Sequence, residues 1–222
     1  TVSFFALLVA GNRMPMIFFL FSIFLLLLFQ KNLKKNIILF LLIFSVIFTV
    51  MYNLFPQFKS HYKGFYIKSH KIITSVMTGN VDPKNSGVLF RGHFKEFYAG
   101  YETWKLNKIY GAGVKSFKYN CPKTNVGNCG PHPHNYYLEL MANLGIIGLI
   151  LFISIYFIII FKKFLNISKN KGSFYNEKYE NIIFVLFFVE FFPIKTTGSF
   201  FTTGNAAYFM LILAILVSLL FS

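Results

Sequence analysis

Acidic residues are scarce in this chain: seven Asp and Glu stand against 22 Lys and Arg among 222 residues, which leaves a formal net charge of +15. Such an excess of positive charge attracts anionic partners, which include lipid headgroups, phosphates and nucleic acids. Nucleic acid is disfavoured because the basic residues flank long apolar runs. The charge balance therefore favours phosphate and lipid partners at a membrane.

Cysteine is also rare, because Cys121 and Cys129 are the only two in the sequence. Their spacing is not the CxxC pattern of metal-binding or redox sites. Both lie in one polar segment, which the topology derived below places outside the cytoplasm. A bacterial periplasm is oxidising, so we predict a local disulfide between them.

The start of the chain lacks a signal peptide. The sequence begins at Thr1 and is apolar at once, without the charged start, short apolar core and small-residue cleavage site of a secretory leader. We expect that the sequence begins inside a transmembrane helix and that a further N-terminal part precedes it. The chain also has no internal repeat, and no linker long enough to divide it into domains.

Apolar residues, by contrast, are abundant: 55% of the chain is hydrophobic and 20% is aromatic, with 31 Phe. A soluble domain of this length has too little interior to bury so much apolar surface. The composition predicts an all-α polytopic membrane protein, a bundle of about five transmembrane segments with a large, partly helical periplasmic loop. A spanning helix needs about 20 mainly apolar residues, and the candidate runs are 1–10, 14–29, 37–55, 136–161, 182–192 and 206–221.

Lysine-rich short loops give the orientation, because such loops stay in the cytoplasm. Segments 30–36 and 162–181 fit that rule, so Arg13, the segment 56–135 and Lys195 fall outside. We therefore expect transmembrane segments over 1–55, a periplasmic catalytic loop over 56–135, and transmembrane segments over 136–222. The last part would contain the cytoplasmic loop at 162–181 and a broken helix near 193–205.

The long external segment carries twelve Lys and Arg against three acidic residues. Two stretches within it, 58–77 and 90–104, have the apolar spacing of amphipathic helices. Aromatic and basic helices of this kind lie in the membrane interface. In the second stretch the expected apolar side consists of Phe90, Phe94, Phe97, Tyr98, Tyr101 and Trp104.

Two histidines end this segment, where Pro131-His132-Pro133-His134-Asn135 runs into an apolar helix. Residues two apart point the same way in an extended strand, so His132 and His134 would share a face. A metal site, a structural histidine and a general base are all open interpretations. Histidine titrates near pH ~6.5 in water and can accept a hydroxyl proton at neutral pH. Asn135 suits the N-cap of the following helix.

Two arginines are candidates for anion binding, because the planar guanidinium donates two parallel hydrogen bonds to phosphate. Arg13 lies between two apolar runs and Arg91 opens an amphipathic stretch. A snorkelling or topology-setting role for Arg13 and a solvated position for Arg91 are the alternatives. Glu190 and Lys195 flank Pro193 and either act at membrane depth or pair with each other.

Taken in order, these motifs resemble those of the O-antigen ligase and O-antigen polymerase superfamily, bacterial envelope glycosyltransferases. The resemblance extends over about residues 11–205 and corresponds to the C-terminal half of the family. Its most specific part is His-Asn-x-x-Leu followed by Gly-x-x-Gly at a helix start. The matching segments are 11–13, 111–117, 121–129, 132–139, 144–148 and 193–201.

The resemblance implies an inverting, metal-independent transfer without cofactor at the periplasmic face of the inner membrane. The donor would be a glycan on undecaprenyl pyrophosphate, and the acceptor a sugar hydroxyl of lipid A–core in ligases or a second lipid-linked glycan in polymerases. Arg13 and Arg91 match the pyrophosphate-binding arginines, and His134 matches the histidine that activates the acceptor. Possible supporting residues are His132, Asn135, Lys115 and Lys195.

Ligase is the leading interpretation, and a polymerase that joins lipid-linked repeat units is the alternative within the superfamily. A membrane transporter or a scaffold is the rival from another class. It would explain the spans, Glu190 and the break at Pro193, but it gives no reason for a long cationic loop that ends in His-Asn.

Overall fold

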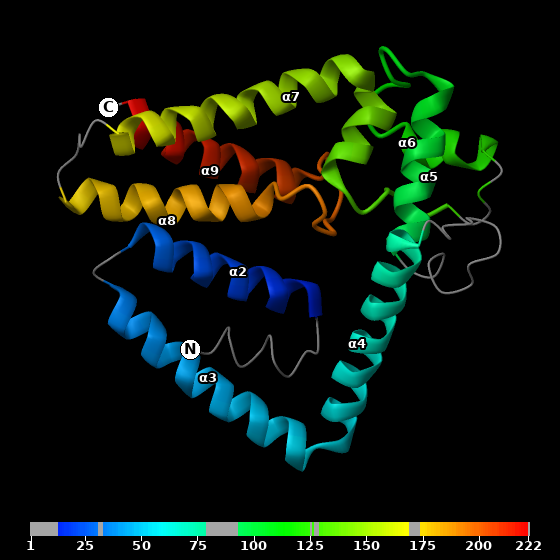
Figure 1. The fold of residues 1–222 in the computed structure, drawn as a ribbon. Coiled ribbons are helices and arrows are strands. Elements are labelled where there is room, and N and C mark those ends of the chain that lie inside the picture. Colours follow the sequence, from blue (N-terminus) through cyan, green and yellow to red (C-terminus); the bar gives the residue numbers. More distant parts are fainter. Residues whose placement is uncertain are drawn as a thin grey trace. The chain divides into compact units, whose positions relative to one another are not determined.

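The structure is a computed structural model that describes residues 13–30, 33–78, 93–124, 126, 129–168 and 174–221. All regular secondary structure in these ranges is helical, which confirms the predicted all-α membrane protein (Figure 1). The helices are α2 (Arg13–Phe29), α3 (Lys34–Leu54), α4 (Pro56–Met77), α5 (His93–Leu106), α6 (Phe117–Asn120), the 3-10 helix η2 (Cys121–Lys123), α7 (Tyr136–Ser168), α8 (Phe174–Glu190) and α9 (Thr203–Phe221).

Three of the described helices are long and apolar enough to cross a membrane: α3, the part Tyr136–Asn166 of α7, and α9. The apolar stretch Met14–Phe29 in α2 is shorter, and the expected run 1–10 lies outside the described residues. Helix α3 has no buried residue although it is strongly apolar. Lipid is the medium in which such a helix is stable, because all its backbone groups are satisfied internally.

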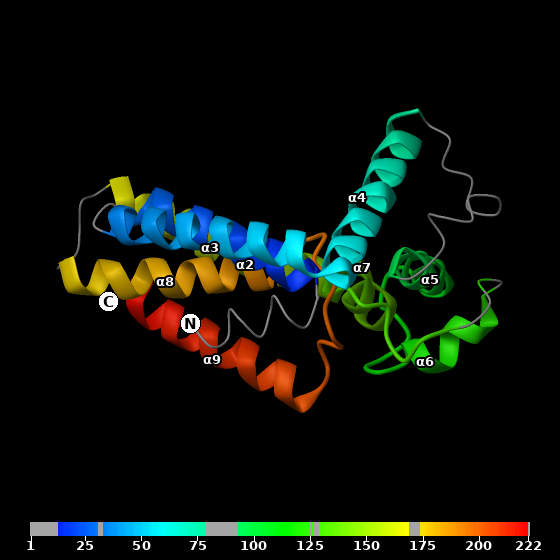
Figure 2. The same cartoon turned by 90° about the horizontal axis from the view of Figure 1, so that it is seen from below.

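The chain divides into two units, residues 1–90 and residues 91–222. In the first unit Met16 of α2 packs among aromatic side chains of α3 and α4, and the Tyr62 hydroxyl donates to the Met16 sulfur at 3.2 Å. Helix α3 ends just before Pro56, which begins α4, and the two helices meet at an angle (Figure 2). A proline suits the first position of a helix, because its nitrogen has no hydrogen to satisfy. The amphipathic stretch predicted over 58–77 thus lies in one helix.

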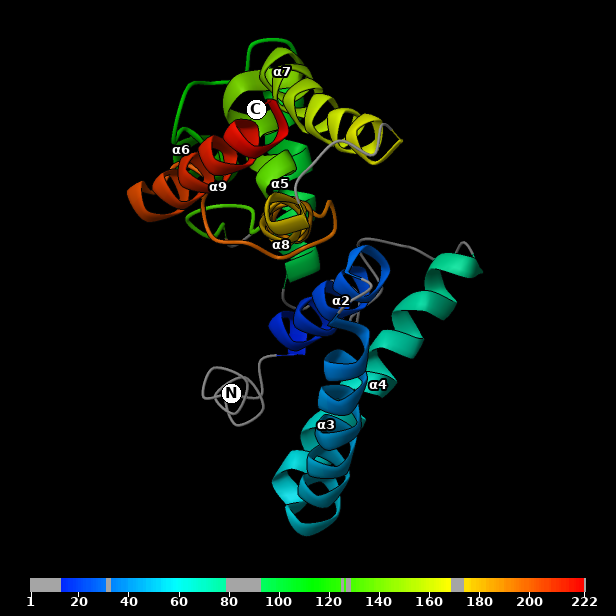
Figure 3. The ribbon, with the colours of Figure 1, turned by 90° about the vertical axis from the view of Figure 1, so that its left-hand side faces the viewer.

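In the second unit α9 packs against both α8 and α7, and it crosses α8 at an angle (Figure 3). Their shared core is aromatic, and the Phe191 and Phe209 rings form one of its edge-to-face pairs, with centroids 4.8 Å apart. The rings of Phe152 and Phe200 pack against the same cluster. Phe191 and Phe200 belong to the segment 191–202, which joins α8 to α9. Their rings therefore attach this segment to the helices.

Helix α5 packs on α7 through small residues rather than through its aromatic stripe. Ala99, Gly100 and Thr103 are its buried positions, whereas 43% of Tyr101 is exposed. On the expected apolar side, Phe97, Tyr98 and Trp104 are only partly buried, so the closest packing of α5 is on its small residues. Small side chains let two helices approach closely, and the aromatic side is left for the surroundings.

The predicted single span from Tyr136 is wrong in one respect, because the helix breaks at Gly145. That residue has φ 68° and ψ −167°, so a short helical piece from Tyr136 turns away from the long part of α7 (Figure 1). The loop before α6 satisfies the groups that the break frees. Ala112 N and Gly113 N donate to the carbonyls of Ala142 and Asn143, while Ile146 N and Ile147 N donate to those of Lys108 and Ile109.

The cytoplasmic loop predicted at 162–181 is shorter in the structure, since α7 continues to Ser168 and α8 begins at Phe174. Lysines ended the apolar run in the sequence, but one of them turns inward. Lys163 is 1% exposed, and its ammonium donates to Glu180 at 2.7 Å and also to Asn181. A buried ammonium that is paired with a carboxylate and has a second acceptor can be accommodated between two packed helices.

Candidate active site

His134 lies at the turn that leads into α7, in an unusual backbone conformation. Its φ is 53°, in the left-handed region that non-glycine residues seldom occupy. The preceding Pro133 is fully buried, and Asn135 is 4% exposed. Flanking residues that are held this firmly keep the histidine in a conformation that costs about 1–3 kcal/mol.

Two hydrogen bonds join His134 to Thr197 of the segment between α8 and α9. Thr197 N donates to the His134 carbonyl at 2.8 Å, and His134 Nδ1 lies 3.2 Å from the Thr197 carbonyl oxygen. A carbonyl only accepts, so Nδ1 carries the hydrogen. In the neutral imidazole the lone pair is then on Nε2, which is the nitrogen that can take a proton.

Glu96 of α5 approaches that same nitrogen. Its Oε1 lies 3.5 Å from His134 Nε2, and both side chains are partly open, with 27% of His134 and 29% of Glu96 exposed. A small molecule that reaches the Nε2 lone pair therefore also meets a carboxylate. Glu96 and His134 are 38 residues apart in the sequence, and their contact joins α5 to the turn before α7.

The His132 and His134 rings lie close together, with centroids 4.2 Å apart and planes tilted by 49°. The two histidines do share one side, but not through the extended backbone that the prediction assumed, because His134 has φ 53°. Burial, and then the neighbouring His134, lower the pKa of His132 below that of a free imidazole, so it is neutral near pH 7. Its Nε2 is buried, and the described residues offer it no hydrogen-bond partner. Among the residues that the structure describes, no group of three or more His, Cys, Asp or Glu side chains is arranged to hold a metal ion.

Asn135 has the predicted capping geometry: Oδ1 accepts from Tyr137 N at 3.1 Å and from Leu138 N at 3.2 Å. Its amide nitrogen points the other way, donating to the Pro193 carbonyl at 2.7 Å and to that of Lys195 at 3.3 Å. One side chain therefore caps α7 and holds the segment 191–202 at the same time.

Lys195 pairs with Glu190, one of the two roles that the sequence left open. Glu190 also accepts from the Tyr136 hydroxyl at 3.0 Å. Nearby, the buried Glu139 accepts from Ser199 Oγ and Phe200 N, both at 2.6 Å. These contacts fix the segment 191–202 against α7, so that Thr197 is presented to His134. Their effect on the site is indirect, through the position of this segment.

Lys115 lies apart from this cluster. It is exposed, with φ 60°, and within the described part of the chain no hydrogen bond or ion pair joins it to the histidines or to Glu96. Its neighbours Ser116 and Phe117 instead donate to Asn143 Oδ1, at 2.9 and 3.2 Å. The motif that contains Lys115 thus holds the kink of α7.

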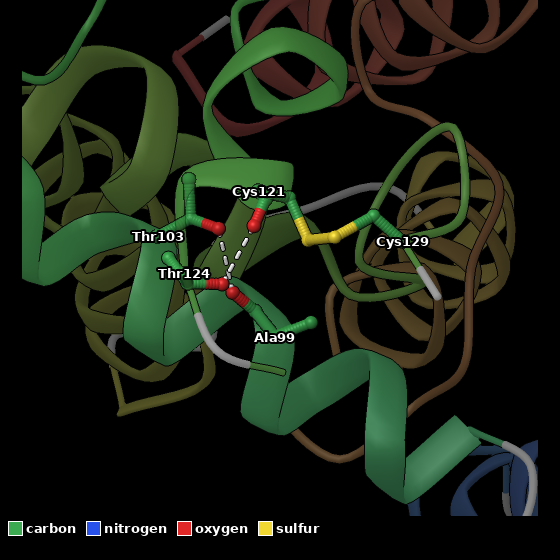
Figure 4. The surroundings of a disulfide bond; sticks show 5 residues. All are labelled: Ala99, Thr103, Cys121, Thr124 and Cys129. Atoms are coloured by element: carbon green, nitrogen blue, oxygen red, sulfur yellow. Dashed lines mark hydrogen bonds between the residues drawn. A yellow bond between two sulfur atoms is a disulfide. The ribbon is translucent and has the colours of Figure 1, made fainter. Parts of the chain in front are cut away.

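Cys121 and Cys129 form a disulfide, with Cα atoms 5.9 Å apart (Figure 4). Cys121 is completely buried and packs with Ala99, Phe117 and Ala142. The disulfide thereby ties the loop before the histidines to α5 and α7. It lies behind the site rather than in it.

The structure does not describe the side chains of the two candidate arginines. Arg91 lies outside the described residues. Arg13 begins α2, and its side chain lies outside them as well. The pyrophosphate clamp therefore remains a prediction from the sequence.

These features define the class of protein: a helical, multi-pass membrane protein that holds a histidine and a carboxylate side by side where a helix begins. The chain belongs to the O-antigen ligase family, whose model matches residues 1–153. Searches of curated proteins and of solved structures found no match. The family makes the protein a glycosyltransferase-like enzyme of O-antigen processing, and so of lipopolysaccharide biosynthesis.

The matched range contains His134, Asn135, both cysteines and the Gly145–Gly148 pair, and it ends before Thr197. Sequence reasoning missed Glu96 and Thr197. Glu96 had a weak signal, as one of three acidic residues in a strongly basic segment. Thr197 lies in the segment 193–201 that carries part of the resemblance, but its contact with His134 was not predicted, because it uses only main-chain atoms of Thr197.

Proposed function

We propose that this protein is an O-antigen ligase. It moves an O-antigen glycan from undecaprenyl pyrophosphate to a sugar hydroxyl of lipid A–core, with inversion and without a metal, at the periplasmic face of the inner membrane. The family match supports the superfamily, and the ligase reaction and these substrates go beyond it.

The observation that carries the proposal is the state of His134. Because Nδ1–H faces the Thr197 carbonyl, the lone pair of the neutral ring is on the partly exposed Nε2. A general base must offer a lone pair within reach of the hydroxyl that it deprotonates. His134 meets that requirement, and His132 does not, because its Nε2 is buried.

The chemistry follows from that arrangement. His134 Nε2 takes the proton of the acceptor hydroxyl as its oxygen attacks the anomeric carbon of the donor. The bond from that carbon to the pyrophosphate oxygen breaks, and the electron pair leaves with undecaprenyl pyrophosphate. Attack opposite the leaving group inverts the anomeric centre.

The leaving group gains negative charge as the bond breaks, and fixed cations lower that barrier. Arg13 and Arg91 are the residues proposed to bind it, because arginine matches phosphate oxygens in a bidentate manner. The surrounding external segment has twelve basic and three acidic residues. That charge would attract both the pyrophosphate and anionic lipid.

The proposed orientation puts the site in the periplasm. Lysine-rich segments at 30–36 and 162–181 favour the cytoplasm, which leaves α4, α5 and the histidines outside. The disulfide supports the same side, since disulfides persist in oxidising compartments.

A deletion strain complemented with the full-length protein tests the proposal. We expect wild-type protein to restore polymer-bearing lipopolysaccharide, and His134→Ala and Arg91→Ala to leave core without polymer while long lipid-linked polymer accumulates. His70→Ala is the matched control, because His70 is exposed on α4, and it should complement fully. Expression and membrane insertion of each variant are compared by immunoblot.

Normal banding in both the His134 and Arg91 variants would refute this mechanism. Core that carries a single repeat unit in the deletion strain would instead identify a polymerase. If the purified protein transfers no glycan but exchanges a solute across liposomes, the transporter alternative is correct.

A further inference from the structure

We infer that Glu96 is a positioning residue for glycan transfer: its carboxylate stabilises the protonated His134 that forms when the acceptor hydroxyl gives up its proton. This inference rests on the proposed function and adds a second charged group to it. The observation behind it is the 3.5 Å separation of Glu96 Oε1 from His134 Nε2.

The direction of the effect follows from which nitrogen faces which oxygen. Since the Thr197 carbonyl takes the Nδ1 hydrogen, neutral His134 turns a lone pair toward Glu96. Two acceptors at 3.5 Å have no hydrogen between them. Once Nε2 takes the hydroxyl proton, the same two atoms become an N–H donor and a carboxylate of opposite charge. Glu96 therefore interacts more favourably with the proton-transferred state than with the ground state, and such differential interactions accelerate a reaction.

Glu96 is held in that place by the packing of α5. Gly100 follows it by four residues and so lies on the same helix face. A Cβ added at Gly100 would come within 2.8 Å of Pro133 Cβ and 3.0 Å of Leu138 Cβ. Helix α5 thus lies close to Pro133, which precedes His134, and to Leu138 in the first turn of α7, and its buried Ala99 and Thr103 lie on the same side of the helix.

The charge of Glu96 reaches the second histidine as well. It raises the pKa of His132, although burial and His134 lower it by more. The neighbouring His132 therefore stays neutral beside the reacting ring, while Glu96 brings a negative charge to within 3.5 Å of His134 Nε2. A neutral neighbour adds no repulsion to the imidazolium that forms on His134.

Three variants of the full-length protein in proteoliposomes test this role. The probes are undecaprenyl pyrophosphate that carries the strain's own repeat units and core-only lipopolysaccharide from the deletion strain. We expect Glu96→Gln to lower kcat by roughly 100-fold, the scale of proton-transfer catalysis, with the KM of the donor unchanged within about twofold. Glu96→Asp keeps the charge on a shorter stem and should recover about a tenth of the wild-type kcat or more.

Glu102→Gln is the matched control, because Glu102 is on the same helix and pairs with Lys105 at 2.7 Å. It should retain wild-type kcat. Intact Cys121–Cys129 linkage and an unchanged thermal midpoint in detergent report that each variant is folded. If Glu96→Gln does not fold, Glu96→Asp alone decides the question.

Wild-type kcat in Glu96→Gln with an inactive His134→Ala would overturn this inference and leave the proposed function standing. Wild-type kcat in both would remove the proposed function too. A Glu96→Asp protein that is folded but no more active than Glu96→Gln, or a loss confined to KM, would also overturn the role assigned to the charge.

Discussion

At the scale of single residues, the contacts of Asn135 explain why an asparagine, and not another capping residue, follows His134. Its oxygen caps the first turn of α7, while its amide nitrogen donates to the carbonyls of Pro193 and Lys195. The first function suits Asp, Ser or Thr equally well. The second requires a donor, which a carboxylate lacks, and a hydroxyl has one hydrogen on a single oxygen for two carbonyls. The amide has its acceptor and its two donor hydrogens on separate atoms.

Asn135→Asp separates these functions. One carboxylate oxygen can still cap the helix. The other replaces the amide nitrogen, so an acceptor faces the carbonyl oxygens of Pro193 and Lys195 at a residue that is only 4% exposed. An unpaired buried acceptor costs about 1–3 kcal/mol, and a charged one costs more. We expect the thermal midpoint of the detergent-solubilised protein to fall by roughly 5 °C or more, and glycan transfer to fall with it.

Asn107→Asp is the control for that change, since Asn107 is exposed and no hydrogen bond of its side chain is shown among the described residues. A carboxylate there stays hydrated and should leave the midpoint near wild type. Equal midpoints for the two variants would show that the amide donor of Asn135 is unimportant.

Much of the residue-scale account could be predicted from the sequence. The adjacent His134 and Asn135, the cap and the pairing of two cysteines all lie within a short segment. Glu96 and Thr197 could not be predicted to approach His134, because they come from α5 and from the segment after α8. Such contacts depend on packing between elements, which hydrophobic periodicity does not reveal.

At the scale of elements, the break of α7 at Gly145 explains why glycine occurs at 111 and at 145. Gly111 and Gly145 lie so close that a Cβ on either would clash with backbone of the other segment. The predicted uninterrupted span from 136 missed this break, because the sequence around it stays apolar and glycine alone does not stop an apolar run.

Gly145→Ala tests the break. Its Cβ would lie 2.1 Å from the Ile109 carbonyl oxygen, and its φ of 68° is strained for alanine. We expect no stably folded protein, or a loop that no longer docks, seen as a thermal midpoint lowered by more than about 5 °C and as lost transfer.

Gly204→Ala provides the comparison, because nothing lies within 4 Å of an added Cβ in the first turn of α9. That variant should be as stable as wild type. If the Gly145→Ala and Gly204→Ala proteins had the same thermal midpoint, the close approach to Ile109 would not be required for stability.

At the scale of the whole molecule, the charge distribution, the apolar runs and the disulfide each support the proposed orientation. The fold class and most helices could be predicted, since runs of apolar residues determine them directly. The lengths of α7 and α8 were underestimated, because Lys163 ended an apolar run in the sequence but is buried beside Glu180 in the structure.

The disulfide allows this orientation to be tested. Both cysteines of the chain are in it, so in the periplasm neither should react with a maleimide polymer in denatured membranes until a reductant is added, after which two labels should attach. Labelling without reductant would place the loop in the cytoplasm. Cys121→Ser/Cys129→Ser should lose about 2–3 kcal/mol of stability, the value that loop closure predicts for this separation, measured by thermal unfolding.

The most direct test of the central claim is the transfer rate of purified, reconstituted full-length protein with and without the His134 imidazole. The assay follows labelled glycan from undecaprenyl pyrophosphate onto core lipopolysaccharide. The account predicts that wild type transfers it and that His134→Gln is at least about 100-fold slower, while His132→Gln retains most of the activity. A folded His134→Gln protein that transfers glycan at the wild-type rate would contradict it.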